Sequence, residues 1–237
     1  MPLSPEQEWT LIACGLIAHA DGILEVGEWD QVMYLLDERL QADEVDQWAE
    51  ILADLPKLEA RKEKAALPPP FFAETILEKA WRMALADGRG SDAEIQVHDQ
   101  LAETLGVDAT QVAKWRESWL QRAARRAEPI AGFAAVVANI DGLTDSEERL
   151  RYDEILQTLP VSDERREELC GLIDNPPAMV DVVGGLAAME PDDRAIALRQ
   201  IVPIVHSASG TKERQAFLDL AEAVAVSRED ATKMLER

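Results

Sequence analysis

A short pattern that recurs four times along the chain constrains its fold most strongly. In three copies an apolar helical run ends at Asp-Gly, and a glutamate follows seven residues after the aspartate. These copies are Asp21-Gly22 with Glu28, Asp87-Gly88 with Glu94, and Asp141-Gly142 with Glu148. A fourth copy, Ser209-Gly210 with Glu213, is shorter and lacks the aspartate. Because glycine accepts the left-handed backbone that follows a helix end, each copy predicts a turn between two helices.

The spacing of the four turns predicts a duplicated domain. Asp21 and Asp87 are 66 residues apart, Asp141 and Ser209 are 68 apart, and Asp21 and Asp141 are 120 apart. In each half a proline stretch, 68–70 or 176–177, lies between the two turns and would end the preceding helix. We therefore expect an all-α protein with domains at residues 1–126 and 127–237, each built from two helical hairpin units.

Local signals predict where several of these helices begin. Ser91 with Glu94, and Thr144 with Glu147, have the spacing of capping boxes. No segment alternates with a period of two for long enough to predict a sheet. Residues 180–183 come closest, but the prolines before them and the glycines after them favour a short helix.

Other side chains give weaker predictions. Cys14 and Cys170 lie in apolar stretches and are expected in the core, as are Trp115 and Trp119 on one helix face. The three histidines share no metal-ligand spacing, although Glu94 and His98 could form a metal pair or a surface contact. The basic run 122–126 is expected to stabilise a helix C-terminus, with a contact to anionic lipid or an acidic partner as the alternative.

Charge and hydropathy exclude some classes of partner. Among 237 residues, the formal net charge of −22 opposes binding to nucleic acid, because phosphate backbones are repelled. No apolar stretch approaches the ~20 residues that span a bilayer. The first residues also lack a basic region followed by an apolar run, so we expect no signal peptide and a cytoplasmic location.

The sequence resembles the TerB family of tellurite-resistance proteins over nearly its whole length. The resemblance rests on Ala20-Asp21-Gly22 with Glu28, Ala86-Asp87-Gly88 with Glu94, and Asp141-Gly142 with Glu148. It implies two tandem TerB-like domains, the second degenerate in its last turn. It also implies a role in tellurite or chemical-stress resistance, divalent-cation binding, and a protein partner that is embedded in or associated with a membrane. A peripheral position at the inner membrane would follow.

The chemistry of the turns allows a cation site. Asp21, Glu28, Asp87, Glu94, Asp141 and Glu148 are the candidate ligands, and Glu25, Asp92 and Asp145 could join them. Clustered carboxylates with backbone carbonyls suit a hard cation such as calcium or magnesium. Compared with an EF-hand loop, however, the first ligand position holds Ile17, Met83 or Val137, which predicts weak binding.

Three classes of function are to be compared. The first is a non-enzymatic binding module that acts through a divalent cation and protein contacts. The alternative is a structural helical adaptor whose Asp-Gly turns are only helix caps. A carboxylate metalloenzyme is a third class, which no histidine ligand supports. In the fourth turn, Lys212 is expected to neutralise Glu213 and replace a cation, leaving the second half for a partner-binding role.

Overall fold

The computed structural model describes residues 3–20, 42–85, 90–140, 142, 144–207 and 211–236. Within these ranges the protein has twelve α-helices and two short 3-10 helices, and no strand. The all-α prediction is confirmed. The chain divides into two compact units, Met1–Gln121 and Arg122–Arg237, which we call unit 1 and unit 2. This division falls five residues before the predicted boundary at 126/127, and the TerB-like assignment of the halves stays a prediction.

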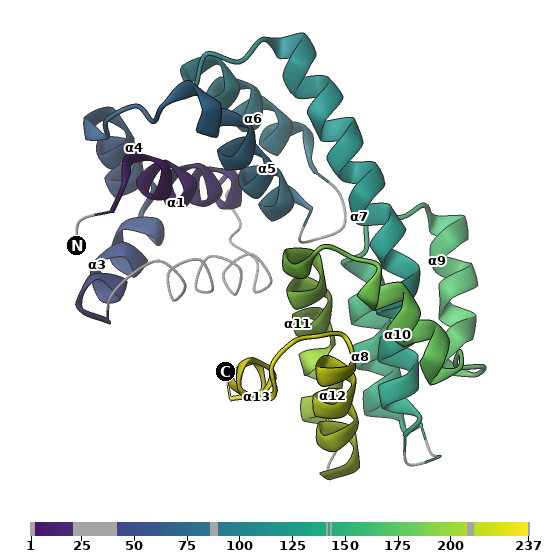
Figure 1. Ribbon diagram of the computed structural model, residues 1–237. Coiled ribbons are helices and arrows are strands. Elements are labelled where there is room, and N and C mark those ends of the chain that lie inside the picture. The colour runs from purple at the N-terminus through teal and green to yellow at the C-terminus, as the bar shows by residue number, and fades with distance from the viewer. Residues whose placement is uncertain are drawn as a thin grey trace. The chain divides into compact units, whose positions relative to one another are not determined.

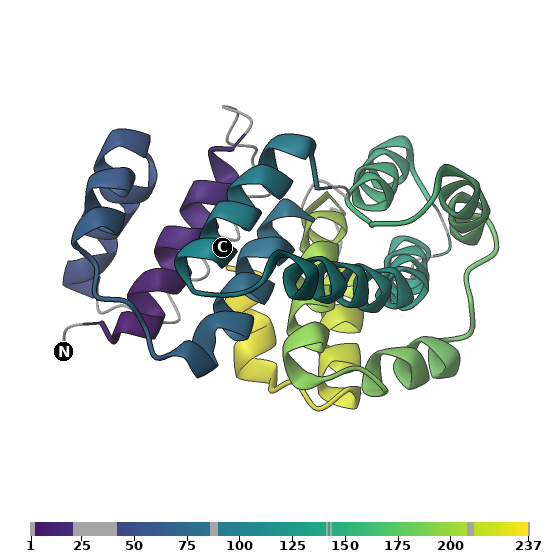
Figure 2. The ribbon, with the colours of Figure 1, turned by 90° about the horizontal axis from the view of Figure 1, so that it is seen from above.

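Unit 1 is organised around a helix that is buried on all sides. Its elements are α1 (Pro5–Ala18), α3 (Ala42–Leu52), α4 (Leu55–Lys64), η1 (Pro70–Phe72), α5 (Ala73–Ala84), α6 (Asp92–Thr104) and the first part of α7 (Ala109–Ala138). Every residue of α1 from Trp9 to Ala18 is buried, which its uniformly apolar sequence favours. α1 lies between α3 and α4 on one side and α5 and α6 on the other (Figure 1; Figure 2).

The close approach of these helices depends on a glycine in α1. A Cβ atom added at Gly15 would lie 2.6 Å from a methyl carbon of Leu52 and 2.9 Å from one of Leu58. Both leucines are buried, so neither can move away easily. Gly15 therefore lets α3 and α4 pack directly against the backbone of α1.

Unit 2 has one continuous core. Its elements are the rest of α7, α8 (Ser146–Gln157), α9 (Asp163–Cys170), η2 (Gly171–Ile173), α10 (Met179–Ala187), α11 (Pro191–Ser207), α12 (Thr211–Ala223) and α13 (Arg228–Met234). Residues 130–138 of α7 are all buried, as residues 9–18 are in α1. The Phe133 and Phe217 rings stack with their centroids 6.0 Å apart, which joins α7 to α12. α10 confirms the predicted short helix at residues 180–183.

Two local predictions are wrong. α7 continues through Pro129 to Ala138, so the basic run 122–126 lies inside a helix and not at its C-terminus. Burial of the apolar stretch beyond Pro129 outweighs the loss of one backbone hydrogen bond at the proline. Cys14 is buried as predicted, but Cys170 is exposed, because it ends α9, a helix of mostly charged residues that buries only Leu169. None of the helices described is long and apolar enough to cross a membrane.

Candidate functional site

The predicted cation ligands fall into two groups. Four of them, Asp21, Glu28, Asp87 and Asp141, lie outside the described residues. Glu94 and Glu148 are described, and both are buried, with 4 and 5% of their surface exposed. Within the described ranges no three acidic, histidine or cysteine side chains are grouped so that they could hold a metal ion. Glu94 and Glu148 are therefore the only predicted ligands among the described residues.

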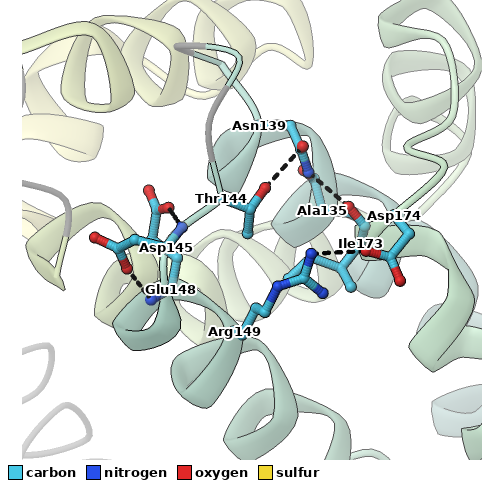
Figure 3. A network of polar contacts seen from close by, with 8 residues as sticks. All are labelled: Ala135, Asn139, Thr144, Asp145, Glu148, Arg149, Ile173 and Asp174. Atoms are coloured by element: carbon cyan, nitrogen blue, oxygen red, sulfur yellow. Dashed lines mark hydrogen bonds and ion pairs between the residues drawn. The ribbon is translucent and has the colours of Figure 1, made fainter.

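Glu148 is part of a capping box at the start of α8 (Figure 3). The Asp145 side chain accepts hydrogen bonds from the backbone N–H groups of Glu147 and Glu148, at 2.8 and 2.9 Å. In return, the Glu148 carboxylate accepts the Asp145 N–H at 2.8 Å. The box predicted from Thr144 and Glu147 is thus shifted by one residue. Aspartate is a stronger N-cap than threonine, which explains the shift.

Glu94 has the same role at the start of α6, where the predicted box is confirmed. The Ser91 hydroxyl accepts the Glu94 N–H at 3.2 Å, and the Glu94 carboxylate accepts the Ser91 N–H at 2.6 Å. Gly90 precedes this cap, and a Cβ atom there would lie 2.5 Å from the Trp81 ring. The chain can therefore enter the cap beside Trp81 only without a side chain at residue 90.

One polar residue just before the first turn and another just before the third each form a hydrogen bond to a backbone carbonyl at a distant helix end. Sequence reasoning missed these contacts. The Asn139 amide donates hydrogen bonds to the carbonyls of Ala135 and Ile173, at 2.9 and 2.8 Å, and its oxygen accepts the Thr144 hydroxyl at 2.8 Å (Figure 3). His19, which is 120 residues earlier, donates from Nε2 to the Leu52 carbonyl at 2.7 Å. Leu52 is the last residue of α3, and Ile173 is the last residue of η2. The shared position of two polar residues in the repeat was the signal that could have revealed this contact.

We expect Asn139→Ala to lower the free energy of unfolding of unit 2 by about 1–2 kcal/mol, because a buried carbonyl and a hydroxyl lose their partner. Urea unfolding followed by far-UV circular dichroism measures the change. Asn175→Ala is a matched control, because Asn175 is exposed on the connection that follows Ile173 and should change stability by less than about 0.5 kcal/mol. Equal losses in the two variants would contradict the structural role of Asn139.

The fourth turn differs from its prediction. Glu213 is buried near the start of α12, but its Oε2 atom has no hydrogen-bond partner. No ion pair joins Lys212 to Glu213, although both are described, because consecutive side chains of a helix do not face each other. Lys212 instead lines an open groove of unit 2 with a volume of about 630 Å³. Its lining residues are Ile140, Met179, Val183, Thr211, Lys212, Gln215, Ala216, Asp219, Leu220 and Ala223.

A buried cluster in unit 1 surrounds His98, which is completely buried on α6. Nε2 donates to the Leu77 carbonyl at 2.9 Å, so the neutral ring accepts at Nδ1 from Arg116 at 3.2 Å. Burial lowers the pKa of His98 to about 4, and the Arg116 charge acts in the same direction. Both ring nitrogens are occupied, so His98 forms neither the metal pair with Glu94 nor the surface contact that its spacing suggested.

Aromatic rings complete this cluster. Trp81 and Trp119 approach the His98 ring edge-on, at centroid distances of 5.2 and 6.1 Å. Arg116 lies over Trp81 at 5.5 Å and pairs with Asp99 at 2.6 Å. Trp119 is in the core as predicted, whereas Trp115, stacked on it at 5.9 Å, is only partly buried. The arrangement holds α5, α6 and α7 together.

No protein-family model, curated protein or solved structure matches this chain. The resemblance to the TerB family therefore rests on the residues and spacing of the turns alone.

Proposed function

We propose that this protein is a non-enzymatic helical adaptor whose Asp-Gly turns are structural helix connections. The observation that carries the proposal is the engagement of Glu94 and Glu148, whose carboxylates each accept the N–H of their own helix N-cap. A carboxylate that is buried and bonded in this way stabilises a helix start without an ion. Divalent-cation binding, tellurite resistance and a membrane-associated partner stay predictions of the TerB resemblance.

Protein contacts are supported by where apolar side chains are exposed. Six large hydrophobic side chains are exposed in the described part of the chain, and four of them flank the two proline connections. These four are Leu67 and Phe71 in unit 1, and Met179 and Val180 in unit 2. Apolar side chains gathered at equivalent places favour contacts with other proteins. An adaptor needs such surfaces and no reactive groups.

The two interpretations of the turns are separated by glutamine substitutions. Glutamine keeps the capping hydrogen bond but removes the charge that a cation needs. For helix caps, the double variant Glu94→Gln with Glu148→Gln should melt close to the parent protein. The double variant with alanine should lose about 1 kcal/mol for each cap. Differential scanning calorimetry measures both.

The same calorimetry repeated with calcium shows which result would contradict the proposal. Under our proposal, millimolar calcium changes the melting temperature of the parent protein and of the glutamine variant equally. A rise seen in the parent and lost in the glutamine variant would show that the turns bind the cation, and the adaptor proposal in this form would fail.

A further inference from the structure

The connection between α4 and α5 has a regular pattern of exposure. Ala65 is partly buried and Pro68 is buried, whereas residues 66, 67, 69 and 70 are exposed. A period of three is that of a polyproline II helix, which has three residues per turn. One edge of residues 65–69, which we call the proline segment, therefore lies on unit 1, and the other two edges face outward.

The backbone confirms this conformation. Ala65 has φ −69° and ψ 134°, and Pro69 has φ −53° and ψ 139°, close to the ideal polyproline II values. Three consecutive prolines fix φ at residues 68–70 and restrict the residue before each of them to extended geometry. At about 3.1 Å per residue, five residues extend over roughly 15 Å.

The proline segment is fixed at both ends. The Trp9 indole N–H donates to the Ala66 carbonyl at 3.0 Å, which ties the segment to α1. At the other end, the Phe72 N–H donates to the Pro69 carbonyl at 3.0 Å as η1 begins. A ligand held in its bound conformation loses little conformational entropy on binding, so weak contacts can suffice.

The large side chains exposed in and beside the proline segment are apolar, and two lysines nearby carry positive charge. Leu67 is 62% exposed and Phe71 is 75% exposed. The Phe71 ring packs on Phe72 with the centroids 4.2 Å apart. Lys62 and Lys64, at the end of α4, form no ion pair with any described residue. In a chain of net charge −22, these two lysines place positive charge beside an apolar surface, with the exposed Glu63 between them in the sequence.

We propose that residues 65–69 are a preformed polyproline II ligand for another protein, with Phe71 of η1 as an adjoining apolar anchor. The partner holds them in an aromatic-lined groove with acidic residues at its margin. Grooves of this type recognise proline-rich segments in the polyproline II conformation, and acidic margins complement Lys62 and Lys64. The inference rests on the adaptor function proposed above and names the class of partner. A second copy of this chain is a poorer occupant, because the described groove of unit 2 has no aromatic lining residue.

The test uses the full-length protein, labelled with ¹⁵N, and three purified probes that carry aromatic-lined grooves: an SH3, a WW and an EVH1 domain. We expect at least one probe to shift the amide signals of residues 65–72. Phe71→Ser should weaken that binding at least about tenfold, since an exposed aromatic anchor is lost. Pro69→Gly, which frees the backbone, should weaken it about two- to five-fold.

Val180→Ser is the matched control, because Val180 is 74% exposed beside the other proline connection and should leave probe binding unchanged. Far-UV circular dichroism confirms that each variant is folded. The proposal is overturned if no probe shifts residues 65–72, or if Phe71→Ser and Val180→Ser bind equally. Sedimentation that shows a dimer dissociated by Phe71→Ser would overturn it in favour of a second copy. These outcomes do not depend on calcium, so the adaptor proposal is tested separately.

Discussion

Asp193→Ala is expected to lower the free energy of unfolding of unit 2 by about 3–5 kcal/mol. Asp193, in the first turn of α11, forms an ion pair with Arg126 of α7, and the two side chains are only 6 and 13% exposed. Truncation of the aspartate removes this carboxylate from the Arg126 charge in a poorly solvated place, where the loss of a counter-ion is costly. Urea unfolding by circular dichroism, with hydrogen–deuterium exchange of unit 2 peptides, measures the loss.

Two further variants isolate the cause. Asp192→Ala removes an exposed acidic residue from the same helical turn, and should cost at most about 1 kcal/mol through the helix dipole. The double variant Arg126→Met with Asp193→Leu replaces the pair by apolar side chains and should recover most of the lost stability. A loss in the double variant as large as in Asp193→Ala would show that packing, and not the uncompensated charge, determines the effect.

The features that the sequence predicted correctly are local. Caps, glycines and prolines within a few residues of one another predicted three features correctly. These are the helix that begins after Ser91, the all-α class, and the short helix after the second proline stretch. The shifted capping box at Asp145 is an error of one residue within such a signal. Local chemistry thus placed most helices, although it did not determine what their side chains contact.

The features that the sequence did not predict join distant segments. Arg126 and Asp193 are 67 residues apart, and Asn139 contacts the carbonyl of a residue 34 positions away. The basic run around Arg126 indicated a helix end, but tertiary burial extends α7 through Pro129. His98 likewise gave no sign of complete burial, because its surroundings come from three helices. Such contacts depend on packing, which periodicity does not determine.

The stability of unit 1 is expected to fall by about 3 kcal/mol, through His98 alone, as the pH decreases from 6.5 to 4. Burial lowers the pKa of His98 in the folded protein to about 4, whereas an unfolded histidine has a pKa near 6.5. Below pH 6.5 the unfolded chain therefore binds a proton that the folded protein does not, and unfolding becomes easier. The contribution is complete above pH 6.5 and is lost by about pH 4.

The measurement is urea unfolding followed by tryptophan fluorescence, which reports unit 1 because all six tryptophans precede residue 122. Carboxylates also titrate in this range, so the quantity of interest is the difference between the parent protein and His98→Gln. Glutamine can still bond to the Leu77 carbonyl but cannot take up a proton there. We expect the variant to lose about 3 kcal/mol less than the parent between pH 6.5 and 4, even though it is less stable throughout.

His206→Gln, which changes an exposed histidine of unit 2, should follow the parent profile. If the His98→Gln profile is parallel to that of the parent, the folded protein protonates the His98 ring as readily as the unfolded chain does, and the donor and acceptor roles assigned to its nitrogens must be revised.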